Sequence, residues 1–424
     1  MATFLFYVEP YPIRNSYVHF CTILDNFAMS LDHNQTEHDF LIYANEKTLL
    51  EMDNRHEGWK KHFILPTAKE SQLFDSCMMD WDDGGIEKWE ELMENSELSQ
   101  KYIDIIKQIH LRKPFDYIIC WGTNFAVKQA AKELDIGFIN MELGCSRSPF
   151  LDSLVADPWG VNGSSALSKS DISDFKDISP SNAEDDFLFS GGINSKAYES
   201  KFTYINATQI LNKIGESKIA LISLQLYDDA NQVHYSPFES VKSVLQKILP
   251  PLQEKGYTCI IKEHPASNIR RGSEDANLEA KLYALDFENV VWLTCKDKDI
   301  QNSTLFRIAD VVITVNSSSG FEALFYEKPV VVLGDAVYKP TNVFPTLEDY
   351  LEGNFDEKAY KTNIGKIRNF FLHYYLFSHE QANDSHFFFP YLKFIGDMSK
   401  KQMTIEEIIE TYHNYRSERS VYRK

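Results

Sequence analysis

The chain has 424 residues, which is long for one hydrophobic core and favours two domains. Its hydrophobic content of 43% and mean hydropathy of −0.34 are those of an ordinary globular protein. The net charge of −19 argues against general nucleic-acid binding, because an acidic surface gains nothing from counterion release, so any site for an anionic substrate must be locally basic.

Six cysteines are scattered along the chain, with neither a C-x-x-C pair nor a metal-ligand spacing. Several lie in apolar runs, where a buried free thiol is the expected state, and this favours a reducing compartment. No run reaches about 18 apolar residues, so we expect no membrane-spanning helix. The N-terminal sequence MATFLFYVEPYPIRN is typical of a first strand and not of a signal peptide. We therefore expect a cytoplasmic protein, attached to a membrane at most peripherally.

The first 200 residues alternate between short apolar runs and helical patterns, which is typical of an α/β domain. A strong strand at 115–120 leads into a helix at 125–134 and then into a strand at 137–141. This order predicts a parallel sheet of the doubly wound type. The remaining predicted elements of this domain are strands at 3–8, 39–43 and 62–65, and helical segments at 16–30 and 70–112.

Two polar segments of this domain are candidates for ligand contacts. The loop after the strand at 137–141 carries Glu142, Ser146 and Arg147, and a loop salt bridge is the alternative for Glu142 and Arg147. The sequence Asp80-Trp81-Asp82 has the D-x-D form that binds a metal-nucleotide in some glycosyltransferases. It lies in an acidic helical region, where a solvated turn is commoner, so we predict no metal site.

A segment rich in Ser, Asp, Asn and Gly at 168–197 predicts a connection, with a domain boundary near 190–205. Four strand–helix units follow and predict a second Rossmann-like domain over 201–365. We expect the helical segment 366–424 to cross back to the first domain and to end in a basic tail, either a linker or a weak membrane contact. The predicted elements are strands at 219–224, 257–262, 290–293, 311–315 and 330–333, and helices at 201–213, 240–249, 303–308 and 321–326.

The unit at 309–334 is a strand, a serine-rich turn, a helix and a second strand. Ser317, Ser318, Ser319 and Gly320 form the turn, whose backbone N–H groups and hydroxyls suit a phosphate at a helix start. A capped turn without a ligand is the alternative. Glu322 in the first helical turn could reach a pair of ribose hydroxyls and favours the nucleotide.

Three loops of the second domain, 225–231, 262–265 and 316–322, should meet at the carboxyl edge of one sheet. Lys262 and His264 directly follow a strand and can hold phosphate oxygens. Asp228 and Asp229 are either a solvated acidic turn or the general base or nucleophile at an anomeric carbon.

The chain resembles GT-B glycosyltransferases, which have two Rossmann-like domains facing across a cleft. More narrowly, it resembles the retaining β-Kdo transferases of bacterial capsule and O-antigen synthesis, which use CMP-Kdo. The segments that carry the resemblance are Glu142-Leu143-Gly144, Ser146-Arg147-Ser148, 153–157 with Gly160-Val161, Gln225, Asp228-Asp229-Ala230, 262–265 and 317–324. The chain departs from the family pattern at Leu143, at Glu263 (where proline is usual) and at the Pro158-Trp159 pair.

The resemblance implies that CMP-Kdo reacts by double displacement, with no metal or cofactor. Asp229 would be the nucleophile, with Asp228 as the alternative, and Glu142 the acid/base. Arg147, with Ser146 and Asp157, would receive the acceptor or the sugar carboxylate. The implied donor-binding residues are Gln225, Lys262, His264, Ser317, Ser318, Ser319, Gly320 and Glu322, with His264 also catalytic.

The implied partners are a sugar nucleotide and a lipid-linked glycan acceptor at the inner face of the bacterial inner membrane, and no nucleic acid. Two other interpretations stay open. One is a different GT-B enzyme, similar to sialyltransferases or to UDP-sugar 2-epimerases. The other is a non-catalytic glycan-binding scaffold.

Overall fold

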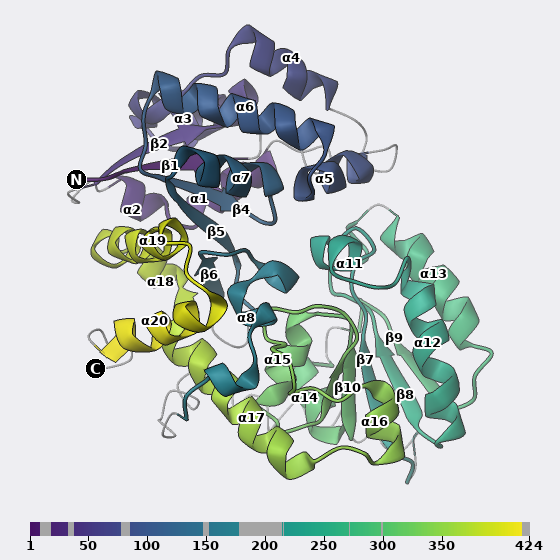
Figure 1. Cartoon of the computed structure of the whole chain (residues 1–424). Helices are drawn as coiled ribbons and strands as arrows, with labels where there is room; N and C mark the ends of the chain where they lie inside the picture. The colour runs from purple at the N-terminus through teal and green to yellow at the C-terminus, as the bar shows by residue number, and fades with distance from the viewer. Residues whose placement is uncertain are drawn as a thin grey trace. The chain divides into compact units, whose positions relative to one another are not determined.

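The computed structural model describes residues 1–8, 18–32, 38–77, 85–146, 152–177, 214, 216–270, 272–297 and 300–417. The chain divides into two compact units (Figure 1). Unit 1 comprises Met1–Gly144, Ser153–Ala166 and Phe377–Ile408, and unit 2 comprises Cys145–Asp152, Leu167–Leu376 and Ile409–Lys424. The boundary predicted near 190–205, the helix at 201–213 and the Asp80–Asp82 motif lie outside the described residues.

Unit 1 contains a seven-stranded sheet in the order β12-β6-β5-β4-β1-β2-β3. The five predicted strands are confirmed and run parallel, with Leu5 beside both Leu41 and Ile118. Two short strands were not predicted: β6 runs antiparallel to β5, and β12 runs antiparallel to β6. The strands are β1 (Thr3–Tyr7), β2 (Asp39–Tyr43), β3 (Phe63–Ile64), β4 (Tyr117–Trp121), β5 (Gly137–Leu143), β6 (Ser153–Asp157) and β12 (Phe377–Ser378).

Several helices of unit 1 begin where a polar side chain caps an N–H group. Ser96 and Asn124 accept hydrogen bonds from the backbone N–H of the third residue of α6 and α7, respectively. The predicted helical segment 70–112 is divided between three helices, and the segment 16–30 between two. The helices are α1 (Val18–Asp25), α2 (Ala28–Asp32), α3 (Glu46–Arg55), α4 (Ala68–Ser76), α5 (Ile86–Met93), α6 (Glu97–Arg112), α7 (Phe125–Leu134), α18 (His379–Ala382) and α19 (Ser385–Lys400), followed by α20 (Ile405–Ser417).

Helix α19 packs on β5 at a point where two glycines allow close approach. A Cβ atom added at Gly137 or at Gly396 would lie 2.3 Å from the ring of Tyr117. That ring cannot turn aside, because it stacks on Phe4 at 4.8 Å and its hydroxyl donates to Asp397 at 2.5 Å. The C-terminal segment is therefore tied closely to the sheet formed by the first half of the chain.

Unit 2 contains five parallel strands in the order β11-β10-β7-β8-β9, all of them predicted. Counted from the first strand of each unit, this is the same 3-2-1-4-5 order that β1 to β5 have in unit 1. The prediction of an α/β chain with two Rossmann-like, doubly wound domains is confirmed. The strands are β7 (Ile219–Ser223), β8 (Thr258–Lys262), β9 (Val290–Leu293), β10 (Val311–Thr314) and β11 (Val330–Val332).

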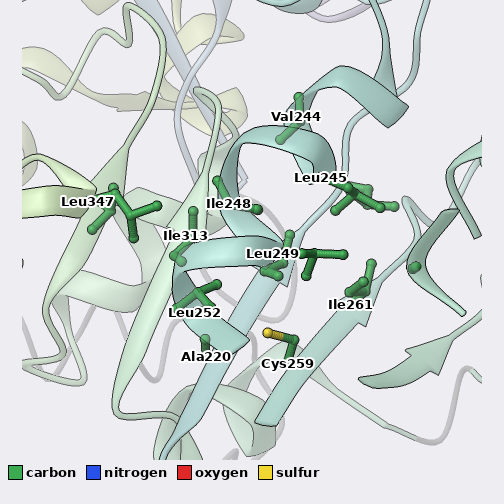
Figure 2. Packing of buried hydrophobic residues seen from close by; sticks show 14 of the residues in the cluster. Ala220, Val244, Leu245, Ile248, Leu249, Leu252, Cys259, Ile261, Ile313 and Leu347 are labelled. Carbon is green, nitrogen blue, oxygen red and sulfur yellow. The ribbon is translucent and has the colours of Figure 1, made fainter. Parts of the chain in front are cut away.

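The strands of this sheet are apolar at successive positions, so both faces of the sheet carry apolar side chains and are covered by helices. Figure 2 shows α12 on one face, where Ile248 and Leu252 pack among Ala220, Ile261 and Ile313. Figure 1 shows α14 and α15 on the opposite side of the sheet from α12 and α13. The helices are α8 (Ala166–Lys169), α11 (Ala230–His234), α12 (Val241–Glu254), α13 (Ser273–Ala284), α14 (Asn302–Ile308), α15 (Ser318–Leu324), α16 (Leu347–Glu352) and α17 (Glu357–Phe370).

The end predicted for α12 is wrong. We expected Pro250-Pro251 to stop the helix at Leu249, but it continues through both prolines to Glu254. Leu252, beyond the prolines, is completely buried against the sheet. Burial of this apolar face therefore outweighs the cost of placing proline inside a helix, which is about 3 kcal/mol in an exposed helix.

Replacing Gly396 by alanine should lower the free energy of unfolding by about 1–3 kcal/mol, because the new methyl group overlaps the ring of Tyr117. The matched control is Gly365→Ala in α17, where nothing lies within 4 Å of the added Cβ atom. This control should be neutral or more stable by up to about 1 kcal/mol. Urea unfolding followed by circular dichroism measures both. A Gly396→Ala protein as stable as the wild type would contradict the close packing of α19 on β5.

Candidate functional site

The loops that follow β7, β8 and β10 end at the same edge of the unit 2 sheet, because these strands are parallel neighbours. The chain leaves β7 toward α12 and leaves β10 toward α15, and these helices cover opposite faces. The strand order therefore reverses between β7 and β10. In open α/β sheets, ligands bind outside the carboxyl ends of the strands at this switch point.

Two buried amides join the loops at the switch point. Gln225 follows β7, and its Nε2 donates to Asn316 Oδ1 at 2.8 Å. The backbone N–H of Asn316, which follows β10, donates to Gln225 Oε1 at 3.0 Å. Asn316 Nδ2 donates further to the carbonyl oxygens of Asn231 at 2.9 Å and Tyr235 at 3.2 Å. The predicted donor residue Gln225 is thus a structural link between loops, and Asn316 is its partner.

His264 follows β8 and has a defined tautomer. Its Nδ1 accepts the backbone N–H of Ala266 at 3.1 Å, so the neutral ring carries its proton on Nε2. Burial lowers the pKa of His264, and the cation Arg270 lowers it too, whereas Asp229 and Asp228 oppose this shift. At pH 7 the imidazole is neutral, and Nε2–H is a hydrogen-bond donor.

The two aspartates have different surroundings. Asp228 is buried and accepts a hydrogen bond from Arg270 Nη1 at 2.9 Å; the side chains are 4% and 26% exposed. Asp229 is only partly buried and caps α11 by accepting the N–H of Asn231 at 2.9 Å. The sequence interpretation missed Arg270, although the Arg270-Arg271 pair shortly after the histidine loop was a visible signal.

Lys262 ends β8, and its ammonium group is partly used within the protein. Nζ donates to the carbonyl oxygen of Ile300 at 2.9 Å and to Asn302 Oδ1 at 2.7 Å. Burial lowers the pKa of Lys262 to about 8, against the opposing charges of Glu322 and Asp297. Lysine has three N–H donors, so one remains for a further acceptor. Glu322, in α15 after β10, is buried.

Glu263 lies between the predicted residues Lys262 and His264, where the family pattern has proline. Its carboxylate accepts the Trp292 indole N–H at 2.7 Å and the backbone N–H of Cys295 at 2.9 Å. It therefore fastens the histidine loop to the end of β9. Glu263, which departs from the pattern, therefore has a structural role.

The predicted turn at 317–320 is the start of a helix, because α15 begins at Ser318 and not at Phe321, and this serine turn is only partly accessible. Ser317 caps α15 by accepting the N–H of Ser319 at 3.3 Å, and its carbonyl oxygen accepts the Tyr338 hydroxyl at 2.6 Å. Ser319 and Gly320 are buried, and a Cβ atom at Gly320 would lie 2.2 Å from the same hydroxyl. Ser317 and Ser318 remain as the partly exposed hydroxyls of the turn.

The other predicted residues lie outside these three loops. Glu142 is the second-last residue of β5 in unit 1, where it is half-buried and its Oε1 accepts the N–H of Leu143 at 2.8 Å. Ser146 is buried, and Arg147 lies outside the described residues.

The prediction that Asp157 contacts a sugar conflicts with the structure. Asp157 is completely buried, and its carboxylate accepts the N–H groups of Trp159, Gly160 and Ala166 at 2.7–3.2 Å. It holds the turn that follows β6. A short buried carboxylate is well suited to this role, because it replaces the hydrogen bonds that the irregular backbone would otherwise lose.

In the described part of the chain, no three His, Cys, Asp or Glu side chains are placed to hold a metal ion. Nor does any helix there combine the length and apolar character that crossing a bilayer requires.

Comparisons with known proteins match two consecutive parts of the chain. Residues 64–166 match the glycosyltransferase 99 family N-terminal domain, and residues 165–343 match the family described as capsule polysaccharide biosynthesis protein. The chain is similar to the capsule polysaccharide export protein KpsS of Escherichia coli, with 26% identity over 134 residues, or 31% of this chain and 33% of that protein. The chain spans about a third of the length of the curated relatives that it matches.

Two solved structures illustrate the structural comparisons. Thermosulfurimonas dismutans KpsC, beta Kdo 2,4 transferase, has 18% identity and a TM-score of 0.34, over 60% of this chain and 80% of that chain. UDP-GlcNAc 2-epimerase from Neisseria meningitidis has 14% identity and a TM-score of 0.32, over 96% of this chain and 100% of that chain.

The charges around His264 predict opposite effects of two substitutions. Asp229→Asn should lower the pKa of His264 further, because it removes a negative charge that favours the imidazolium. Arg270→Gln should raise the pKa, because it removes a competing cation. Titration of ¹⁵N-histidine-labelled protein by NMR, with His264→Gln to assign the signal, measures both. If the two substitutions shifted the pKa of His264 in the same direction, or did not shift it, Asp229 and Arg270 would not both lie near His264.

Proposed function

We propose that this chain is a glycosyltransferase of bacterial surface-polysaccharide synthesis that transfers β-Kdo from CMP-Kdo to a glycan acceptor with retention. The observation that supports the proposal is that a neutral histidine, a lysine, a serine-lined helix start and two unequal aspartates all follow strands at one edge of the unit 2 sheet. The glycosyltransferase and capsule-biosynthesis family matches in the same chain support the reaction class.

The donor nucleotide would bind across the serine turn and the histidine loop. Ser317 and Ser318 hydroxyls and the remaining N–H of Lys262 would contact phosphate oxygens, and His264 would donate from Nε2. Glu322 would accept hydrogen bonds from the ribose hydroxyls. These groups supply hydrogen bonds and one full positive charge to a leaving CMP, which stabilises the charge that develops there.

Asp229 is the better nucleophile of the two aspartates. A nucleophilic carboxylate has to reach the anomeric carbon, and Asp229 is partly exposed, whereas Asp228 is buried and paired with Arg270. The capping bond that Asp229 accepts from Asn231 uses one oxygen and leaves the other for attack. Asp228 and Arg270 would act as positioning residues that fix the start of this loop.

Two displacements give retention. Asp229 attacks the anomeric carbon, and the bond from that carbon to the phosphate oxygen breaks to release CMP. The acceptor hydroxyl then attacks the same carbon, its proton passes to Glu142, and the bond to Asp229 breaks. This second step requires Glu142 of unit 1 to reach the donor site of unit 2, which stays a prediction. The lipid-linked acceptor and the cytoplasmic location are proposals that follow from the reaction class.

Asp229→Asn should abolish sugar transfer while keeping the affinity for CMP within a few-fold, because the amide cannot form the covalent intermediate but still caps α11. CMP release from CMP-Kdo and calorimetry with CMP measure the two quantities. The control is Asp335→Asn, a mostly exposed carboxylate of the same unit that pairs with Lys169, which should leave both unchanged. Full activity in Asp229→Asn would remove this residue from the mechanism.

The donor itself is tested with CMP-Kdo, CMP-sialic acid and UDP-GlcNAc as alternative substrates. We expect nucleotide release with CMP-Kdo only. Release from CMP-sialic acid or UDP-GlcNAc instead would assign the chain to one of the other enzyme classes. A chain that binds none of the three nucleotides would be a non-catalytic scaffold.

A further inference from the structure

A cavity lies in unit 1, beside the turn after β6 that Asp157 supports. It has a volume of about 470 Å³, within the range of roughly 300–1,000 Å³ that small-molecule sites occupy. Helix α7, the start of β5, the turn after β6 and the end of α19 form its walls. Its main polar and aromatic lining residues are Lys128, Lys132, Lys400, Gln129, Gln402 and Trp159.

The cavity lies at the opposite end of β5 from Glu142. Phe138 lines it, and Glu142 is four residues further along the strand, or about 13 Å at the usual rise. Asp135 is the one carboxylate among the lining residues, so no pair of carboxylates is available for glycosyl transfer. The chemistry of this cavity is binding and not catalysis.

The cavity is locally basic in an acidic chain. Three lysines against one aspartate give it a net charge of +2, whereas the whole chain has −19. None of the three lysines forms an ion pair with a carboxylate of the described residues. Unpaired ammonium groups gathered in a concavity attract anions and exclude cationic ligands.

Lys128 is the centre of this charge. Its side chain is accessible to solvent but has protein on several sides, and this burial lowers its pKa. The ammonium group lies 4.9 Å from the ring centre of Trp159. The nearby carboxylate of Asp157 is occupied by three backbone N–H groups. Lys128 is therefore held in place by an aromatic ring while its charge stays available.

The remaining lining combines an apolar majority, which includes Phe138, Met398 and Met403, with amides and an indole. Trp159 is 37% exposed and offers an aromatic surface, and the amides of Gln129 and Gln402 offer both donors and acceptors. Sugars combine apolar C–H faces with many hydroxyls and need both kinds of partner. An acyl chain would leave the amides and ammonium groups without partners.

We propose that this cavity is a non-catalytic binding site for an acidic saccharide, whose carboxylates pair with Lys128, Lys132 and Lys400 and whose ring packs against Trp159. In an enzyme that extends an acidic glycan, such a site would hold part of the polymer away from the reacting end. That biological role rests on the proposed function, but the binding itself does not.

The experiment uses a trimer of α2,8-linked sialic acid as the probe, with maltotriose as a neutral saccharide and dodecyl phosphate as an anionic amphiphile. Calorimetry with the whole chain should show binding of the sialic acid trimer that weakens with added salt. Lys128→Gln should weaken it about tenfold or more, equivalent to at least about 1.4 kcal/mol. Trp159→Leu should weaken it similarly. Lys101→Gln, which removes an exposed lysine of α6, should not change it.

Three results would overturn the proposal: equal affinity for maltotriose, unchanged affinity in Lys128→Gln, or binding of dodecyl phosphate without binding of the trimer. Calorimetry with CMP on the same variants separates this site from the donor site. A Lys128→Gln protein that keeps its CMP affinity but loses the trimer supports a separate site. A wild-type chain that binds the trimer but no nucleotide would remove the proposed function and leave this site in place.

Discussion

The candidate site of unit 2 depends on the paired amides of Gln225 and Asn316. Loops at the end of a parallel sheet have no ladder partners, so their relative positions are set by side chains. Gln225 and Asn316 exchange two hydrogen bonds, and Asn316 also donates to carbonyl oxygens at both ends of α11, those of Asn231 and Tyr235. Because the bonds are buried, breaking them would leave polar groups without water, at about 1–3 kcal/mol for each group. The loops that carry Asp229 and the serine turn are therefore fixed to one another without any ligand.

The charged side chains of this site are also held in place by hydrogen bonds within the protein. Lys262 and Arg270 each contact protein acceptors, yet each lies among groups suited to an anionic substrate. His264 is kept neutral by burial, so it donates a hydrogen bond without adding a charge that the nearby Arg270 would repel. The cations of this edge lie among carboxylates that are already bonded: Asp228 pairs with Arg270, and Asp229 and Glu263 each accept a backbone N–H group.

The two units share one strand order but use it differently. In unit 1 the sheet is extended by β6 and β12, and the chain returns through α19 to pack on β5 at the glycine pair. In unit 2 the sheet ends at β11, and the strand-end loops carry a cluster of titratable groups. The same architecture thus provides a scaffold with an amphiphilic cavity in one unit and a polar strand-end site in the other.

The sequence by itself determined the two α/β units, all ten parallel strands and the three loops of the site, since each buried strand is a continuous apolar run and each loop directly follows one. It did not determine β6 and β12, which are short and depend on β5 for pairing, or the passage of α12 through two prolines. Only the tertiary structure decided that Asp157 is a turn support, that Arg270 pairs with Asp228 and that Ser319 and Gly320 are buried. The physical reason is common to all of these: local pattern records which residues prefer to be buried, whereas hydrogen-bond partners come from distant segments that only folding brings together.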